Sequence, residues 1–169
     1  MTDLPGAGGP QTLVLGFGNT LWSDDGAGIE AVNLLAQRPL HPQVRVEAAG
    51  LPGFGLAAQL QEATQEELQR LILVDAAHMG QPPGTWRRFS PQQAALIASD
   101  GIVSLHQADL SSGLALAQAL DILPQEVLFY GIEPACLDAG LELSPAVREA
   151  LPQMVEEILI DLMEWQREE

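Results

Sequence analysis

The sequence has no lysine, a single cysteine and few basic residues of any kind. Its Lys+Arg total of 7, all arginine, stands against 23 acidic residues, which gives a formal net charge of −16. Such a chain repels nucleic acid and anionic membrane surfaces, because binding to either depends on cationic side chains. The lone Cys136 excludes an internal disulfide and a cysteine-rich zinc site. We interpret the charge first as a source of solubility, with a basic partner segment as the alternative.

Long hydrophobic runs are also missing. No stretch is apolar for long enough to span a bilayer, and the first residues lack the basic and apolar regions of a signal peptide. We therefore expect a cytoplasmic protein that binds neither membranes nor nucleic acid. Residues 1–11 are rich in glycine and proline and are predicted to be a disordered tail. Residues 12–169, with an apolar content of 47% over the whole chain, are predicted to form a single globular domain.

Short apolar runs alternate with helical patterns along that domain. Strands are predicted at 12–16, 44–48, 71–74 and 126–132, with an edge strand at 84–89 after a double proline. Helices are predicted at 29–37, 54–64, 109–120 and 144–165, the last with Ser144 and Pro145 at its start and Pro152 as a candidate kink. This alternation predicts an α/β fold whose largely parallel sheet is covered on both faces.

The stretch LVLGFGNTLWSDDGAGIEAV, from Leu13 to Val32, places a glycine-rich turn and two aspartates between a strand and a helix. A dinucleotide-binding turn needs glycine where Leu21 stands, and a P-loop needs a lysine, so neither phosphate-binding interpretation fits. One of the two aspartates, Asp24 or Asp25, could cap the helix, which is worth about 0.5–1 kcal/mol. The other acid is then available for a different task.

Polar residues follow other strands as well, and parallel sheets collect functional groups beyond the carboxyl ends of their strands. Asp75 ends the third strand in LILVDAAH, Glu133 follows the last strand in YGIEP, and His106 precedes a helix in VSLHQ. An acid of the first turn, Asp75 and His106 together make a partial ligand set for a borderline divalent metal. Taken singly, a turn cap for the aspartate and a structural role for the histidine are the ordinary alternatives.

The segment GFGNTLWSDDGAG resembles the signature of the nickel–iron hydrogenase maturation proteases, G-x-G-N-x-L-x-x-D-[DE]-G-x-G. The segments LILVDA, PPGTW, VSLHQ and GIEPACLD…LSPAV are similar to the later motifs of that family, in the same order. The likeness covers nearly the whole chain after its first residues. The motif spacing and SLHQ are most similar to the subgroup that serves membrane-bound uptake hydrogenases.

The resemblance implies a three-layer α/β/α domain with a mostly parallel, mixed central sheet of about five strands. It implies an endopeptidase that acts once on each hydrogenase large-subunit precursor and removes a C-terminal extension after nickel insertion. The metal-contacting residues that it implies are Asp25, Asp75 and His106, with the nickel held by the substrate and no organic cofactor. Asp25 and Asp75 are also the candidate catalytic residues.

Substrate contacts are expected at four further positions, namely Gly18, Asn19, Gly50 and Gly53. The sequence departs from the family at Leu51, where relatives often carry threonine, and Pro52 then stiffens the loop. His78 is a candidate supplementary ligand, with a surface histidine as the more ordinary interpretation.

The catalytic step leaves alternatives, because neither a nucleophile elbow, nor a cysteine–base signature, nor a zinc-protease signature is present. A metal-bound water could be the nucleophile, or Asp25 or Asp75 could act as general base while the metal only docks the substrate. Glu133 is a weaker candidate that could instead support the neighbouring helix. Two other functions stay open: a hydrolase of a small amide or ester, and a non-catalytic, nickel-dependent hydrogenase chaperone.

Overall fold

The computed structural model describes residues 11–50, 54–64, 68–90, 93, 103–104 and 107–167. Residues 1–10 of the tail predicted at 1–11, together with Gly53 and His106, lie outside the described residues. In chain order the elements are β1 (Thr12–Phe17), the 3-10 helix η1 (Ser23–Gly26), α1 (Ala27–Ala36), β2 (Val44–Gly50), α2 (Phe54–Thr64), β3 (Arg70–His78), β4 (Trp86–Phe89), β5 (Val103–Ser104), α4 (Gln107–Ala119), β6 (Glu126–Ile132) and α5 (Pro145–Arg167).

The central sheet has the strand order β2-β1-β3-β6-β4, and the short β5 pairs with β3 off this path. The pairs β1–β2, β1–β3 and β3–β6 are parallel, whereas β4 runs antiparallel along the outer edge of β6. This mixed sheet confirms the predicted α/β fold, including the edge strand after the double proline. No helix in the described part of the chain combines the length and apolarity that crossing a membrane requires.

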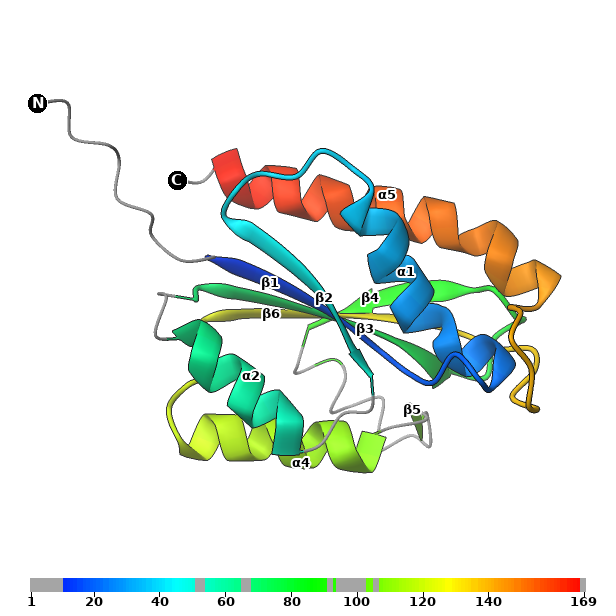
Figure 1. Ribbon diagram of the computed structural model, residues 1–169, viewed down its shortest axis with the longest axis horizontal. Helices are drawn as coiled ribbons and strands as arrows, with labels where there is room; N and C mark the ends of the chain where they lie inside the picture. The colour runs from blue at the N-terminus through cyan, green and yellow to red at the C-terminus, as the bar shows by residue number, and fades with distance from the viewer. Residues whose placement is uncertain are drawn as a thin grey trace, which may run out of the picture.

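Helices cover both faces of the sheet, with α1 and α5 on one side and α2 and α4 on the other (Figure 1). Successive residues of a strand point to opposite faces, so each buried strand supplies two cores. Val14 and Ile72 pack with residues of α1 and α5 in one hydrophobic cluster. Leu13 and Leu73 pack with residues of α2 and α4 in the other. The three-layer architecture expected from the family resemblance is therefore present.

One element, the third strand, differs from its predicted bounds in a way that matters for the site. The third strand continues to His78, so Asp75 lies inside β3 and does not end it as predicted. The extension forms because Ala77 and His78 pair with β5, a long-range contact that a local pattern does not contain. The last helix begins at Pro145 as predicted, and it continues through Pro152 to Arg167.

Candidate active site

Helix α1 begins directly against the carboxyl ends of β1 and β3. A Cβ atom added to Gly28 would lie 2.4 Å from the carbonyl oxygens of Phe17 and Val74, and one added to Gly16 would lie 2.2 Å from the carbonyl oxygen of Gly28. Two glycines are thus required for this close approach. Because η1 directly precedes α1, it is brought into contact with β3. Asp25 on η1 and Asp75 on β3 therefore come from neighbouring elements, and both are buried.

The turn between β1 and η1 wraps around Asp25. Gly18 has a φ of +128°, and its amide donates a hydrogen bond of 2.8 Å to the carbonyl of Gly50. The amide of Asn19 donates to Oδ2 of Asp25 at 3.0 Å, while Oδ1 of Asn19 accepts from the amide of Leu21 at 3.0 Å. Three of the predicted substrate-contact positions, Gly18, Asn19 and Gly50, are thereby joined to one another and to Asp25.

The neighbouring Asp24 binds a distant loop. Its side chain is 0% exposed and accepts four hydrogen bonds, from the amides of Ala135 (2.8 Å), Cys136 (3.0 Å) and Ser144 (2.7 Å) and from Oγ of Ser144 (2.7 Å). Asp24 is not the predicted cap of α1: the N-cap residue of that helix is Gly26, and the carboxylate of Asp24 turns to a distant loop and away from its own helix.

That loop, 133–144, is also held to the first turn through the backbone. The amide of Ser23 donates to the carbonyl of Gly140 at 2.9 Å, and the amide of Gly140 donates to the carbonyl of Leu21 at 2.9 Å. Oγ of Ser23 donates to the carbonyl of Asp138 at 2.9 Å. The first and the last of the sequence motifs therefore form one continuous structure at this edge of the sheet.

Glu133 is a buried anchor for the segment after β3. Its Oε2 accepts hydrogen bonds from the amides of Met79 (2.5 Å) and Gln81 (3.2 Å), and its Oε1 lies 3.3 Å from Nδ1 of His78. The expected support of a neighbouring helix is thus replaced by support of a loop. His78, half-exposed, pairs with this carboxylate.

Asp75 lies opposite Gly131 of β6 in the parallel register, three residues from the end of β3. The strand that leads toward His106 is anchored close by, because Ser104 pairs with Ala77. His106 itself follows two residues later in the sequence and lies outside the described part. Within the described residues, no three His, Cys, Asp or Glu side chains are grouped to hold a metal ion. The three-ligand set that includes His106 accordingly stays a prediction.

The arrangement brings Asp25 and Asp75 to one edge of the sheet on neighbouring elements, and the backbone of the first turn holds Asp25. Carboxylates in such a place suit binding of a divalent cation and abstraction of a proton from water. Sequence reasoning missed the role of Asp24, although the doubled aspartate indicated that the two acids have separate tasks. Its partners lie more than a hundred positions further along the chain, so no local signal could name them.

Comparison with known proteins gives a consistent family. A family model described as hydrogenase maturation protease matches residues 29–161, a range that includes Asp75 and begins after Asp25. The hydrogenase expression/formation protein HupD of Thiocapsa roseopersicina is 33% identical over 149 residues, which cover 87% of this chain and 65% of that protein. The corresponding protein HupM of Azotobacter chroococcum is 36% identical over 144 residues, covering 84% and 66%. The chain spans slightly less than two thirds of the length of these two relatives.

Two solved structures share the fold over almost their full length. The hydrogenase maturating endopeptidase HybD from Escherichia coli superimposes with a TM-score of 0.79 at 26% identity, covering 91% of this chain and 93% of that one. The [NiFe] hydrogenase maturation protease HybD from Thermococcus kodakarensis gives a TM-score of 0.74 at 30% identity, covering 88% and 96%.

Proposed function

The chain belongs to the hydrogenase maturation protease family, and from that premise we propose that it is an endopeptidase of nickel–iron hydrogenase assembly. Its substrate in this proposal is the large-subunit precursor, from which it removes a C-terminal extension after nickel has been inserted. The observation that carries the proposal is that η1 and β3, which bear the buried acids Asp25 and Asp75, contact each other at the carboxyl edge of the sheet. The same two positions match the acids of the family motifs.

In the proposed reaction the nickel arrives as part of the substrate. Asp25, Asp75 and His106 contact the nickel held by the precursor, and this contact brings the extension into position. Water then adds to the carbonyl carbon of the scissile peptide, the C–N bond breaks, and a proton passes to the departing amine. We assign the abstraction of the proton from water to a carboxylate, Asp25 or Asp75, because both groups are fixed at the edge where the nickel would dock.

The backbone around Asp25 serves this role by fixing its direction. The amide of Asn19 holds one carboxylate oxygen at 3.0 Å, and the glycine at position 18 keeps the turn closed beneath it. A misplacement of about 1 Å can lower a rate by on the order of 10²-fold, so a rigid turn favours cleavage of a correctly docked extension. A nickel-free precursor lacks the cation that would place its extension there.

The test is to incubate the protein with the precursor made with and without nickel, while free metal is chelated in both. Cleavage confined to the nickel-loaded precursor, and abolished by His106→Ala, is the expected result. Equal cleavage of both precursors contradicts nickel recognition. Cleavage of a metal-free precursor after nickel is added to the enzyme alone points to a metal owned by the enzyme and to a metal-bound water as nucleophile.

Direct metal binding gives a second readout that does not need the substrate. Titration calorimetry with nickel, on the wild type and on Asp25→Ala, Asp75→Ala and His106→Ala, should show weakened binding in each variant. Unchanged binding in all three contradicts the assigned ligands. Mass spectrometry of the precursor distinguishes a protease, which shortens it, from a nickel-dependent chaperone, which leaves its mass unchanged.

Two finer expectations belong to the same proposal. The motif spacing and SLHQ favour the large subunit of an uptake hydrogenase as the substrate. The proposal also includes the cytoplasmic location expected from the sequence, as the place in which the precursor would be processed.

A further inference from the structure

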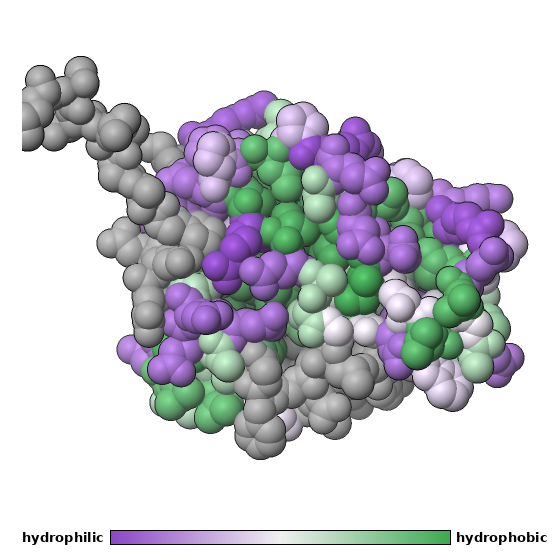
Figure 2. Space-filling model, in the orientation of Figure 1, coloured by the Kyte–Doolittle hydropathy of each residue, from purple (hydrophilic) through white to green (hydrophobic). Residues whose placement is uncertain are grey.

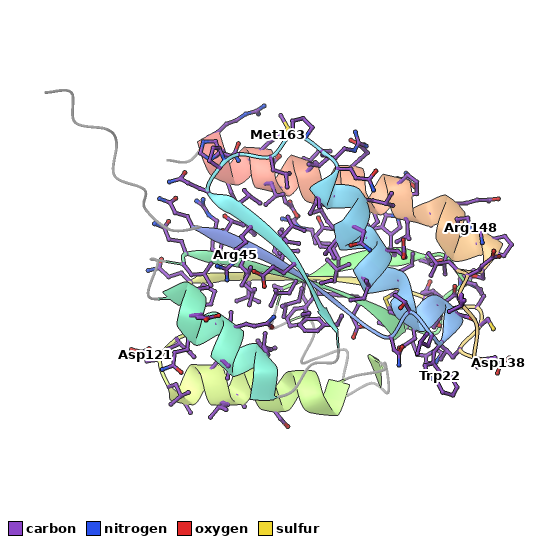
Figure 3. The ribbon with its side chains drawn as sticks, viewed as in Figure 1. Trp22, Arg45, Asp121, Asp138, Arg148 and Met163 are labelled. Carbon is purple, nitrogen blue, oxygen red and sulfur yellow. The ribbon has the colours of Figure 1, made fainter. Side chains whose placement is uncertain are left out.

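Three large hydrophobic side chains are exposed on two neighbouring segments at one end of the molecule. Leu21 is 60% exposed, Trp22 49% and Leu141 81%. They come from segments about 120 positions apart that an isolated parallel bridge joins, with Trp22 opposite Gly140. Figure 3 labels Trp22 and Asp138 at this end, and Figure 2 shows hydrophobic residues gathered there on the visible face. We call Leu21, Trp22 and Leu141 the apolar rim.

The apolar rim is held by a rigid frame. The amide of Gly140 donates to the carbonyl of Leu21, and Ser23 holds Gly140 and Asp138 through its amide and its hydroxyl. Beneath them, the four hydrogen bonds to Asp24 fix both segments at once. Side chains presented on a rigid frame lose little conformational entropy when a partner covers them, so they can contribute affinity.

The apolar rim is continuous with the turn that carries Asp25. The amide of Asp25 donates to the carbonyl of Trp22 at 3.0 Å, and the amide of Trp22 donates to the carbonyl of Asn19 at 3.1 Å. The apolar rim thus lies directly beside the turn that holds Asp25. We propose that the apolar rim is a docking surface for an apolar segment of the large-subunit precursor, an inference that rests on the proposed function.

A second copy of this chain fits the surface less well. Exposed Asp138 and Glu142 flank the apolar rim, and the chain carries a net charge of −16. In a two-fold dimer the same patch meets itself, so the acidic residues of both copies would gather at one interface, although Glu142 is paired with Arg148 in its own chain. A second copy seated here would also stand over the turn of Asp25 and obstruct a protein substrate. The position of the rim and its charge thus favour the precursor as the occupant.

The chain offers a matched control on another element. Ile160 and Met163 of α5 are 47% and 52% exposed, and Met163 lies in a different part of the molecule from Trp22 (Figure 3). The test compares Leu21→Ser/Leu141→Ser with Ile160→Ser/Met163→Ser, using a nickel-loaded precursor. All four side chains are already largely in water, so neither double variant should unfold the protein, and thermal unfolding of each variant checks this.

The apolar-rim variant is expected to raise KM for the precursor by about tenfold, because two leucines each lose apolar contact area with the partner. Its kcat should stay within about twofold of the wild type, since the Asp25 turn is intact. The α5 variant should change neither constant. An unchanged KM in the apolar-rim variant, or an equal rise in both variants, overturns the docking surface. A wild type that does not cleave the precursor contradicts the proposed function instead.

Analytical ultracentrifugation of the wild-type protein tests whether a second copy of the chain occupies the apolar rim, because it measures the oligomeric state. A monomer whose size is unchanged by Leu21→Ser/Leu141→Ser supports the docking proposal. A wild-type dimer that this variant dissociates, with unchanged precursor binding, overturns it in favour of a contact between copies.

Discussion

Two buried aspartates, Asp24 and Asp161, are held in different regions of the molecule by different kinds of donor. At the carboxyl edge of the sheet, Asp24 accepts three backbone amides and one hydroxyl from the segment before α5. In the layer between α5 and the sheet, Asp161 accepts the Tyr130 hydroxyl at 2.5 Å and pairs with a guanidinium nitrogen of Arg88 at 2.9 Å.

The two aspartates therefore have different roles: Asp24 shapes the candidate active site, whereas Asp161 attaches α5 to the sheet. Backbone amides at Asp24 belong to a loop, so this carboxylate determines the path of the chain beside Asp25. Side-chain donors at Asp161 come from β6 and β4, which the sheet already holds in place. Burial raises the pKa of Asp161, and burial followed by the hydrogen bond to Asp161 raises the pKa of Tyr130. Damage at the first region should alter the reaction, while damage at the second should alter stability alone.

The largest effect is expected at Asp25. Asp25→Asn keeps the shape of the side chain but removes its charge, and the rate of precursor cleavage should fall by about 10²–10⁴-fold. The free energy of unfolding should change by about 1 kcal/mol, because the hydrogen bond from the Asn19 amide is weakened. Single-turnover cleavage and urea unfolding measure the two quantities. Cleavage at the wild-type rate would remove Asp25 from the reaction.

Asp24→Asn should lower stability much more than Asp25→Asn does, and the reaction should slow as well because Asp24 positions the chain beside Asp25. An amide group at position 24 turns an NH2 toward backbone N–H donors, and the lost charge-assisted bonds should lower the free energy of unfolding by about 3 kcal/mol. Urea unfolding measures the loss. Asp138→Asn, an exposed neighbour on the same loop, is the control and should change stability by less than about 0.5 kcal/mol. Equal stability of the two variants would show that Asp24 does not hold the loop.

Gly18→Ala tests the turn between β1 and η1, which leads to the two aspartates. A Cβ atom there would lie 1.8 Å from the carbonyl oxygen of Asp25, so η1 must shift, and cleavage should slow by about 10²-fold. Gly80→Ala is the matched control, because Gly80 also has a positive φ, +67°, but a Cβ atom there meets nothing within 4 Å. Slowing of cleavage by the same factor in both variants would assign the effect to backbone strain and not to displacement of Asp25.

The smallest effect is expected in the second region. Tyr130→Phe should lower stability at neutral pH by about 1–2 kcal/mol and leave cleavage unchanged. The folded-state pKa of Tyr130 is raised, so its contribution is complete below its unfolded-state pKa of about 10 and is lost as pH rises above that value. The wild type should therefore lose more stability at high pH than the variant. Tyr130 is the single tyrosine of the chain, so ultraviolet absorbance reports its ionisation directly. Ionisation near pH 10 in the folded protein would contradict the raised pKa.

Much of the architecture could be predicted because it depends on local patterns of apolar residues. Apolar runs of strand length and helical spacings place β1, β2, β6 and α5 close to their predicted bounds. The start of α5 at Pro145 follows from the fixed φ of proline and its missing amide hydrogen. The family motifs also indicated Asp25 and Asp75, and the fold places both at the carboxyl edge of the sheet.

Other features depend on contacts between distant parts of the chain. β3 continues past Asp75 because β5 supplies a partner for Ala77 and His78. Glu133 supports the loop at 79–81, more than fifty positions before it, and no spacing rule predicts that pair. The same holds for the bridge that joins Trp22 to Gly140 and exposes the apolar rim.

The adjacent Asp24 and Asp25 show what the sequence determines locally and what depends on tertiary contacts. By itself the sequence determined that two carboxylates follow a glycine-rich turn, that the chain is acidic, and that strands alternate with helices, since each of these is a local or compositional property. The family motifs had indicated Asp25, but only the tertiary structure decided that Asp24 is the acid buried under the loop at 135–144. The choice depends on backbone donors that reach Asp24 only once α1 and α5 have packed on the sheet, because a carboxylate loses its water there and must be given hydrogen bonds in return.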